Sequence, residues 1–344
     1  MRRRNLLSAS LGLGSLVGLA TVGGMPEALA GALHLHRESL PELASYSGFG
    51  LAFGTTVNIK VFHDSASQAQ RAIEAAMRQI CTVDALMSLY QERSQVFQLN
   101  LHGHVDAPDR HLLQVLATAR HLSTLTAGAF DVTVQPLWLA FSRARSSGRL
   151  PTADELAAAR SRVNWEQLKV SERQVRLQMD GMAITLNGLA QGYAVDLAVE
   201  ALRANGIAHA LLDTGEFGSI GQKKSGQPWV LGIKHPRQIG AVVTKLALDG
   251  RKVATSGDYA TAFSSDYVHH HIFDPESGDS PMALASVTVL SPTGLMADGL
   301  STAFMVMGAT KALALAAQLP NVDVLLVHKN GAIQKSGNFP ELLT

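Results

Sequence analysis

Asp298 and Thr302 are the first residues whose types and spacing suggest chemistry. They lie four positions apart at the start of an apolar segment, so in a helix both side-chain oxygens would emerge on one face. A small number of hard oxygen ligands suits Mg²⁺, which keeps several water ligands and completes its shell with substrate phosphates. In an alternative interpretation, Asp298 is the N-cap of the helix and Thr302 is a packed helix residue. Spacing alone favours this second interpretation.

Three consecutive histidines, His269 to His271, form a second candidate group. In a strand His269 and His271 would share a face, but three adjacent residues cannot surround one ion. Zinc is disfavoured because structural zinc sites need about four ligands, and the single cysteine, Cys81, is far away in the sequence. One histidine facing a phosphate, followed by the turn at 274–278, could instead act as a general base or as a donor to an oxyanion.

A glycine-rich segment, Asn187-Gly188-Leu189-Ala190-Gln191-Gly192-Tyr193-Ala194, is placed between a predicted strand and a predicted helix. Its glycines would let the backbone approach a ligand closely, and the helix N-terminus would offer unpaired N–H groups to a phosphate. The segment matches neither GxGxxG nor GxxxxGK[ST], which argues against a dinucleotide-binding fingerprint and against an ATPase.

The elements that must position these groups are both strands and helices. Alternation of apolar and polar residues over 57–61 predicts a strand, and helical spacing predicts helices. The helices are expected at 67–89, 109–126, 190–204, 297–307 and 310–318. Further strands are expected at 168–171, 174–178, 183–186, 208–212, 229–233, 242–246, 253–255, 268–273, 285–290, 322–328 and 332–335. Since most strands neighbour one another across Gly, Pro and Asp turns, we expect an α+β fold with mixed, largely antiparallel sheets and packed helices.

The N-terminus has the pattern of an export signal. Arg2-Arg3-Arg4 precede a glycine-rich apolar stretch that reaches Ala28-Leu29-Ala30, which matches a charged region, an apolar region and a small-residue cleavage site. Residues 1–30 are therefore predicted to be a signal peptide that is not part of the fold. The adjacent arginines resemble a twin-arginine signal, and an ordinary secretory signal is the alternative. Either route predicts a protein that acts outside the cytoplasm.

The remaining residues, 31–344, are predicted to form a single domain, because no repeat, low-complexity tract or change of composition marks a linker. Lys and Arg number 29 and Asp and Glu 28, so no global field favours nucleic acid, and any partner must be recognised locally. Cys81 lies in a segment with helical spacing, and we expect it to be a small buried core residue.

Taken in order, several stretches of the chain resemble the thiamine-biosynthesis lipoprotein family, now understood as FAD:protein FMN transferases (ApbE). The resemblance covers about 53–342. Each stretch is modest by itself, but eight in the family's order are very improbable by chance. The stretches are Phe53-Gly54-Thr55, 86–90 (LMSLY), 128–137 (GAFDVTVQPL), 186–196 (LNGLAQGYAVD), 228–233 (PWVLGI), 254–259 (ATSGDY), 271–278 (HIFDPESG) and 297–303 (ADGLSTA).

The resemblance implies a T-fold-like flavin transferase architecture and a role for each ambiguous residue. Asp298, Thr302 and a main-chain carbonyl near Gly188 would hold Mg²⁺ against the pyrophosphate of FAD, and Asp298 would thereby be catalytic. His271 would lie near the pyrophosphate, where it would activate the acceptor hydroxyl or stabilise charge. The residues implied to line the FAD site are Phe53, Tyr90, Ala129, Phe130, Asp131, Thr185, Gln191 and His271.

The implied reaction is Mg²⁺-dependent transfer of FMN from FAD to a Thr or Ser hydroxyl of an acceptor flavoprotein through a phosphoester bond, with release of AMP. Two alternatives stay open. Water could replace the acceptor, which would make the protein an FAD pyrophosphatase that yields FMN and AMP. The protein could also bind FAD in the periplasm without catalysis.

The chain departs from the family's pattern at several positions. Phe53 replaces the usual methionine, and Thr185 stands where an acidic residue is frequent. Gln191 replaces a lysine or glutamate, Glu216 replaces the second glycine of a Gly-Gly-Asp turn, and Ser277 replaces a threonine. Gln191 and the turn at 213–216 resemble the branch associated with nitrous oxide reductase maturation, which would modify a membrane-bound, periplasm-facing flavoprotein.

Overall fold

The computed structural model describes residues 43–223, 226–340 and 342–343. The predicted signal peptide at 1–30 lies outside the described residues. The bounds of the elements given below are those of the structure.

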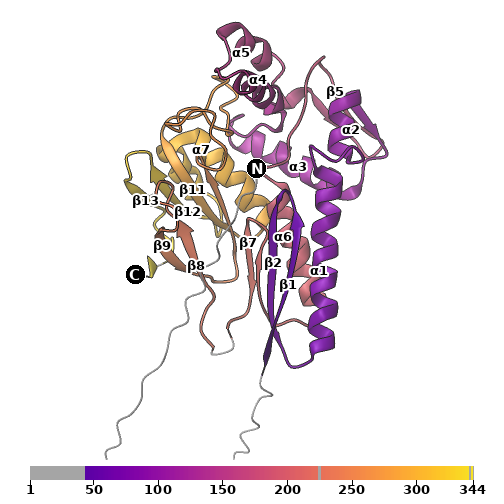
Figure 1. Cartoon of the computed structure of the whole chain (residues 1–344), viewed down its shortest axis with the longest axis vertical. Helices are drawn as coiled ribbons and strands as arrows, with labels where there is room; N and C mark the ends of the chain where they lie inside the picture. Colours follow the sequence, from indigo (N-terminus) through magenta and orange to yellow (C-terminus); the bar gives the residue numbers. More distant parts are fainter. Residues whose placement is uncertain (1–42, 224–225, 341, 344) are drawn as a thin grey trace, which may run out of the picture. The chain divides into compact units, whose positions relative to one another are not determined.

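An antiparallel sheet of eight strands forms the centre of the fold (Figure 1), and its strand order is β1-β2-β6-β7-β10-β11-β12-β13. Two long strands at one edge are joined by a tight turn and paired along their whole length from Ala44↔His63 to Ala52↔Thr55. β2 then pairs with β6, so that Asn58 lies opposite Asp213. The strands are β1 (Ala44–Ala52), β2 (Thr55–His63), β6 (His209–Asp213), β7 (Phe217–Ile220), β10 (Lys252–Gly257), β11 (Leu284–Ser291), β12 (Asp323–His328) and β13 (Ile333–Lys335).

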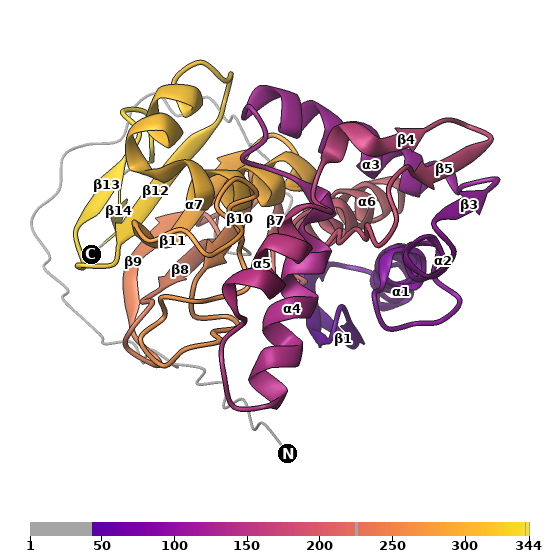
Figure 2. The same ribbon diagram turned by 90° about the horizontal axis from the view of Figure 1, so that it is seen from above.

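Three long helices pack together on one face of this sheet (Figures 1 and 2). They are α1 (Ala66–Met87), α6 (Ala190–Ala204) and α7 (Gly294–Ala316). α1 packs on α6 and α6 on α7, while α7 lies over β10 and β11. The apolar sides of these helices and the inner face of the sheet form the main core.

A small sheet covers the opposite face. It contains β8 (Val230–Lys234), β9 (Val242–Ala247) and β14 (Leu342–Leu343). The Trp229 ring stacks on Phe62 of the main sheet with the ring centroids 5.5 Å apart, and a second core forms around this contact. The site residues near the ends of β6 and β10 are therefore held in a sheet that is packed on both sides.

The remaining elements lie between α1 and α6 in the sequence. β3 (His104–Asp106), β5 (Gln174–Leu177) and β4 (Leu168–Val170) form a third sheet. The helices in this part are α2 (Gln95–His102), α3 (Arg110–Leu125), α4 (Gln135–Ser146), α5 (Ala153–Arg160) and the short 3-10 helices η1 (Val132–Val134) and η2 (Trp165–Gln167).

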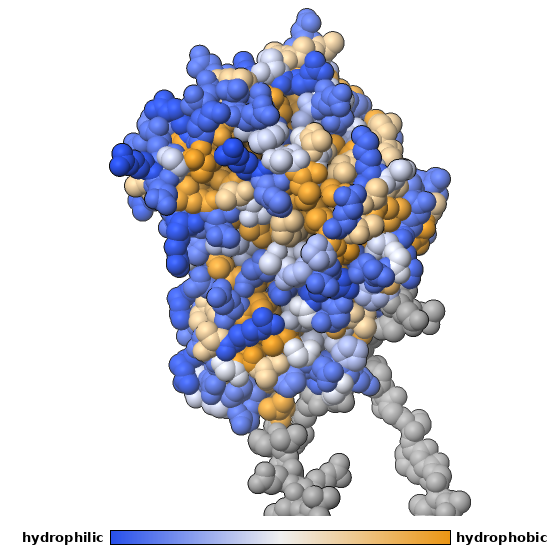
Figure 3. All heavy atoms as spheres, turned by 180° about the vertical axis from the view of Figure 1, so that it is seen from behind, coloured by the Kyte–Doolittle hydropathy of each residue, from blue (hydrophilic) through white to orange (hydrophobic). Residues whose placement is uncertain are grey.

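Within the part of the chain that the structure describes, α7 is the one helix long and apolar enough to cross a membrane. Here it packs on α6, β10 and β11, and residues such as Phe304 and Met305 are buried in the main core. The face seen from behind carries apolar residues in several patches surrounded by hydrophilic ones (Figure 3). Packing in the core accounts for the apolar composition of α7.

The predicted α+β class with largely antiparallel sheets is confirmed, but three local predictions are wrong. Residues 268–273 are not a strand, because this segment forms only one isolated bridge, Ala262↔His270. Residues 183–186 are irregular as well. Cys81 is exposed rather than buried, because α1 turns the side of Ile80 and Val83 towards the core instead.

Candidate active site

The N-terminus of α7 is held by residues other than Asp298. The hydroxyl of Thr293 caps the helix by accepting the Met296 N–H at 3.3 Å. The carboxylate of Asp196, on α6, accepts the N–H groups of Gly294 at 2.7 Å and Leu295 at 3.0 Å. The interpretation of Asp298 as the N-cap of its own helix is therefore wrong.

Asp298 faces the N-terminus of α6 at a point where two glycines let the helices approach closely. Its Oδ2 atom accepts the Gly192 N–H at 3.1 Å, and the residue is only 4% exposed. A Cβ on Gly192 would lie 2.1 Å from the Gly294 carbonyl oxygen and 2.7 Å from Asp298 Cβ. A side chain larger than hydrogen at position 192 would thus push Asp298 and α7 away from α6.

Thr302 lies one turn further along α7, within a small group of hydroxyls. Ser256 Oγ, at the end of β10, is 3.1 Å from Thr302 Oγ1 and 2.7 Å from Ser301 Oγ. Gly188 faces the same hydroxyl, since a Cβ on Gly188 would lie 2.8 Å from Thr302 Oγ1. The structure therefore brings Gly188 to Thr302, and it places Asp298 on the same helix one turn earlier.

Glu216 is a site residue that sequence reasoning noted only as a departure from a glycine turn. It lies between β6 and β7, is 8% exposed, and its Oε2 atom accepts the Thr255 N–H at 2.9 Å. Burial, and next the negative charge of Asp298, raise the pKa of Glu216 well above its usual value. Burial raises the pKa of Asp298 to about 7, and the hydrogen bond from Gly192 opposes this shift. An acidic residue in a turn after a strand is common, so only its contacts reveal Glu216.

These residues fit a divalent cation with oxygen ligands. Asp298 and Glu216 each use one carboxylate oxygen to accept a backbone N–H, and the second oxygen has no hydrogen-bond partner among the described residues. The nearby ligands are hydroxyls and main-chain groups, a chemistry that suits Mg²⁺. Over the described ranges, no three His, Cys, Asp or Glu side chains converge as a metal-binding group, so such a site would rest on few protein ligands.

The three histidines have three different environments, and the expectation that His269 and His271 share a strand face is wrong. His269 Nδ1 lies 2.8 Å from Asp279 Oδ1. His270 is fully buried, with Nε2 3.3 Å from the Pro281 carbonyl oxygen. His271 Nδ1 lies 3.2 Å from the Thr261 carbonyl oxygen. Burial lowers the pKa of His271, so its ring is neutral near pH 7.

Because a carbonyl oxygen can only accept, we assign the ring proton of neutral His271 to Nδ1, which leaves Nε2 as an acceptor. The loop that carries His271 is anchored nearby. Arg237 donates to both carboxylate oxygens of the buried Asp258 at 2.7 Å, and Lys329 Nζ is 3.7 Å from the same carboxylate. No hydrogen bond joins His271 to Asp298 or Thr302.

Two of the residues expected to contact flavin lie around the turn between β1 and β2. Phe53 adopts a left-handed backbone conformation, with a φ of 53°, and its N–H donates to Asp84 Oδ1 at 3.1 Å. The other oxygen of Asp84 accepts from the Gln91 side chain at 2.9 Å, next to Tyr90. The Tyr90 ring is 74% exposed. A ligand could therefore reach Tyr90 without movement of the chain.

A second group surrounds the loop at 129–131. Phe130 is 4% exposed, so its ring packs in the core rather than offering a face to a ligand. The Asp131 carboxylate accepts from the N–H and the hydroxyl of Thr133 and from the Trp165 N–H. Ala129 precedes these two residues, and the Thr185 N–H donates to the Val132 carbonyl. Asp131 therefore shapes this loop.

Gln191 belongs to the group around Asp298. Its Nε2 atom donates to the Thr214 carbonyl oxygen at 2.7 Å, which ties the start of α6 to the turn before Glu216. The predicted site residues thus fall into separate groups at 53 and 90, at 129–131 with 185, at 188–192 with 298 and 302, and at 271.

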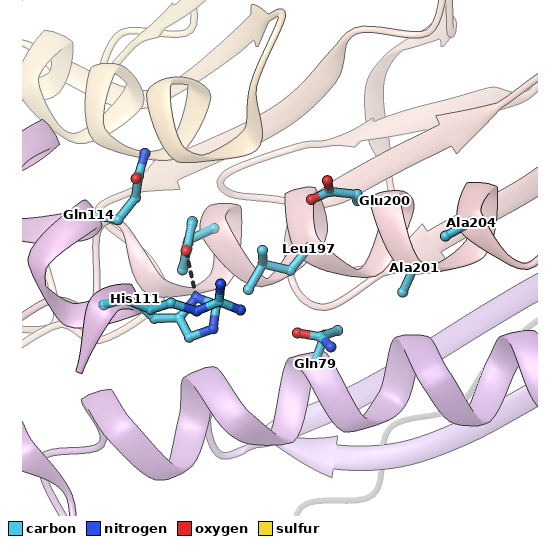
Figure 4. Close-up of a pocket in the computed structure, with 9 residues that line it drawn as sticks. Gln79, His111, Gln114, Leu197, Glu200, Ala201 and Ala204 are labelled. Atoms are coloured by element: carbon cyan, nitrogen blue, oxygen red, sulfur yellow. Dashed lines mark hydrogen bonds between the residues drawn. The ribbon is translucent and has the colours of Figure 1, made fainter.

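A cavity of about 410 Å³ lies on another side of α6, and none of the predicted site residues lines it. Its lining includes His111 and Glu200 (Figure 4). His111 Nδ1 is 2.7 Å from the Tyr193 hydroxyl, so part of the polar lining is already paired within the protein.

Comparisons with known proteins identify the family of the chain. A family model described as the ApbE family matches residues 53–326. The FAD:protein FMN transferase of Haemophilus influenzae is 31% identical over 318 residues, which cover 86% of this chain and 90% of that protein. The corresponding protein of Vibrio cholerae is 32% identical over 291 residues, or 81% of this chain and 86% of that protein.

Solved structures show the same similarity in three dimensions. The ApbE protein of Thermotoga maritima superimposes with a TM-score of 0.76 at 30% identity and covers 86% of this chain and 97% of its own. The flavin transferase ApbE of Vibrio cholerae has a TM-score of 0.74 at 28% identity and covers 88% of this chain and 100% of its own. The fold, the family model and these relatives together show that the chain belongs to the ApbE family.

Proposed function

We propose that this protein transfers FMN from FAD to a Thr or Ser hydroxyl of an acceptor protein. The observation that carries the proposal is that Asp298 contacts Gly192 at the start of α6, while Gly188 lies against Thr302 one turn further along α7. The relatives of the chain are FAD:protein FMN transferases. In the proposed reaction the acceptor oxygen attacks the phosphorus of the FMN half. The P–O bond to the AMP half breaks, a phosphoester forms, and AMP leaves with the electron pair of that bond.

Asp298, Thr302 and a main-chain carbonyl near Gly188 would hold Mg²⁺, which would neutralise charge on the pyrophosphate when bound. The protein contributes rigidity to this site. Gly192 fixes the Asp298 carboxylate through its N–H, and Ser256 holds the Thr302 hydroxyl. Both contacts orient oxygen atoms before any substrate arrives, which lowers the reorganisation that binding requires.

His271 is the group that we propose accepts the proton of the acceptor hydroxyl. Its lowered pKa keeps the ring neutral near pH 7, and the contact with Thr261 leaves Nε2 free to accept a proton. A general base works best when its unprotonated form is populated at the working pH. The Arg237–Asp258 pair holds the neighbouring backbone and so contributes to the position of the loop.

We also propose that the protein works in the periplasm on a membrane-bound flavoprotein that faces that compartment. The support for the periplasm is the N-terminal pattern of three arginines followed by an apolar stretch. The support for the acceptor is the resemblance of Gln191 and the turn at 213–216 to the branch associated with nitrous oxide reductase maturation. The nearly equal numbers of basic and acidic residues favour recognition of an acceptor protein through local contacts, and they do not favour nucleic acid as a partner.

The test of transfer is to incubate the protein with FAD, Mg²⁺ and an acceptor domain that carries a flavinylation motif, and to measure the mass of the acceptor. We expect one FMN phosphoester on a Thr or Ser. Asp298→Asn should lower the rate by at least about a hundredfold, since the metal would lose a charged ligand.

Glu200→Gln is a matched control, because Glu200 is an exposed carboxylate elsewhere on α6, and this variant should keep the rate. Free FMN and AMP without a labelled acceptor would identify a pyrophosphatase instead. Bound FAD that stays intact with several acceptors, all of which a known family member modifies, would favour a binding protein and contradict the proposal.

A further inference from the structure

We infer that Glu216 is a second carboxylate of the metal site, so that the divalent cation binds between Glu216 and Asp298. This inference rests on the proposed function, because it adds a ligand to the metal site proposed there. It concerns a residue that stands in place of a glycine of the family's turn, so the family resemblance does not imply it.

A connected set of hydrogen bonds places Glu216 close to Asp298 and Thr302. Glu216 accepts the Thr255 N–H, and the next residue, Ser256, holds the Thr302 hydroxyl. Ser301 Oγ, which also contacts Ser256, donates to the Asp298 carbonyl oxygen at 2.8 Å. Two consecutive residues of β10 therefore make these contacts. Thr255 binds Glu216, and Ser256 binds the two hydroxyls of α7.

The start of α6 contacts both the Glu216 turn and Asp298. Gln191 donates to the Thr214 carbonyl oxygen, while its neighbour Gly192 donates to Asp298. The turn itself is tight, since Gly215 has a φ of 98° and a Cβ there would lie 2.4 Å from the Gln191 amide nitrogen. Two consecutive residues of α6 therefore hold the Glu216 turn and the Asp298 carboxylate next to each other.

Most of the titratable groups whose charges interact with Glu216 are acidic. Asp298, Asp213, Tyr259 and Lys234 are the titratable groups whose charges act on Glu216 or feel its charge. Lys234 is the one basic group among them, and it is exposed. Two buried carboxylates that repel each other bind a divalent cation well, because the cation replaces repulsion with two attractions.

The first experiment measures binding of Mg²⁺ alone to the full-length chain by calorimetry, without FAD. The natural protein, Glu216→Gln, Asp298→Asn and the surface control Glu200→Gln are compared. Glu216→Gln can still accept the Thr255 N–H, so the turn should keep its shape. We expect Glu216→Gln to weaken Mg²⁺ binding by about tenfold or more, and Glu200→Gln to leave it unchanged.

Equal Mg²⁺ affinity of Glu216→Gln and the natural protein would overturn the inference, as would absence of Mg²⁺ binding by the natural protein. If Asp298→Asn weakens binding and Glu216→Gln does not, the proposed function stands while this inference fails. Failure of FMN transfer by the natural protein, despite Mg²⁺ binding that depends on both carboxylates, would contradict the proposed function alone.

Thermal unfolding supplies a second readout that a purely structural role of Glu216 would not produce. Without Mg²⁺, Glu216→Gln replaces a buried carboxyl whose ionisation folding opposes by an amide that does not titrate, and it should raise the melting temperature above that of the natural protein. With saturating Mg²⁺, the gain in melting temperature should be smaller for the variant, because ligand binding stabilises only in proportion to affinity. A lower melting temperature in both conditions, with an unchanged gain from Mg²⁺, would identify Glu216 as structural and overturn the inference.

Discussion

At the scale of single residues, burial decides which groups can carry charge. Asp298, Glu216 and His270 are almost inaccessible to water, and burial favours the neutral form of each side chain. It raises the pKa values of the two carboxyls and lowers that of the imidazole. The negative charge of Asp298 is one cause of the raised pKa of Glu216, so these two carboxyls are paired. His270 has no such partner, and it lies in the loop next to the proposed base, His271.

The burial of His270 should make its own contribution to stability smaller in mild acid. Burial lowers its pKa from 6.5 to about 4, so between these values the unfolded chain takes up a proton that the folded chain refuses. The contribution of this group to the free energy of unfolding should therefore fall by at most about 3 kcal/mol as the pH drops from about 6.5 to about 4. The raised pKa values of the buried Asp298 and Glu216 act in the opposite direction, so the contribution of His270 is read from the difference between the natural protein and a variant without this imidazole. Urea unfolding at pH 5 and pH 7 measures the change.

His270→Gln should reduce this pH dependence, since glutamine does not titrate and its amide can still donate to the Pro281 carbonyl. His121→Gln, at an exposed position of α3, serves as the control and should keep the slope of the natural protein. An identical pH dependence of the natural protein and His270→Gln would contradict the assignment.

At the scale of elements, the start of α6 and the start of α7 form one unit. Asp196 from α6 caps two N–H groups of α7, and Gly192 donates to Asp298 in return. The glycines at 192 and 294 bring the two backbones into contact. The spacing between the helices, rather than the sequence distance between the residues, therefore sets the geometry of the site.

Gly192→Ala tests this helix contact. The new Cβ would lie 2.1 Å from the Gly294 carbonyl oxygen, so the helices must separate. We expect the free energy of unfolding to fall by about 1–3 kcal/mol, and FMN transfer to fall more than stability accounts for because Asp298 moves. Gly337→Ala is the matched control, since a Cβ there meets no atom within 4 Å. Equal activity of the two variants would show that the contact is dispensable.

The same elements show what sequence can predict. The predicted helix at 190–204 matches α6 because apolar spacing and the Asn205-Gly206 stop are local signals. The prediction of a strand at 268–273 was wrong because the hydrogen bonds of its backbone stay within one loop. The His271 N–H donates to the Thr261 carbonyl, and the Phe263 N–H donates to the His269 carbonyl. The family resemblance implied a role for Asp298, but it implied none for Glu216, whose contacts come from β10, α6 and α7 and only the structure shows them.

At the scale of the whole molecule, the proposed export and the proposed catalysis would make separate demands on the chain. The matched family region, 53–326, begins well after the arginine-led N-terminus. The fold places its site where α6, α7 and β10 meet, so the site depends on contacts between distant parts of the sequence. A twin-arginine route would carry such a chain across the membrane after these contacts have formed.

Replacing Arg2, Arg3 and Arg4 by lysine tests the route, because the substitution keeps the positive charge of the N-terminus. A receptor recognises the arginines of a twin-arginine signal themselves, and lysine would not replace them. We therefore expect the periplasmic fraction of the protein to fall by at least about tenfold. Immunoblots of periplasmic and cytoplasmic fractions measure it. An ordinary secretory signal would tolerate the change, since it needs only the charge, and undiminished export would therefore assign the protein to that route. FMN transfer by the protein retained in the cytoplasm should be unaffected, because the substituted residues lie outside the matched family region.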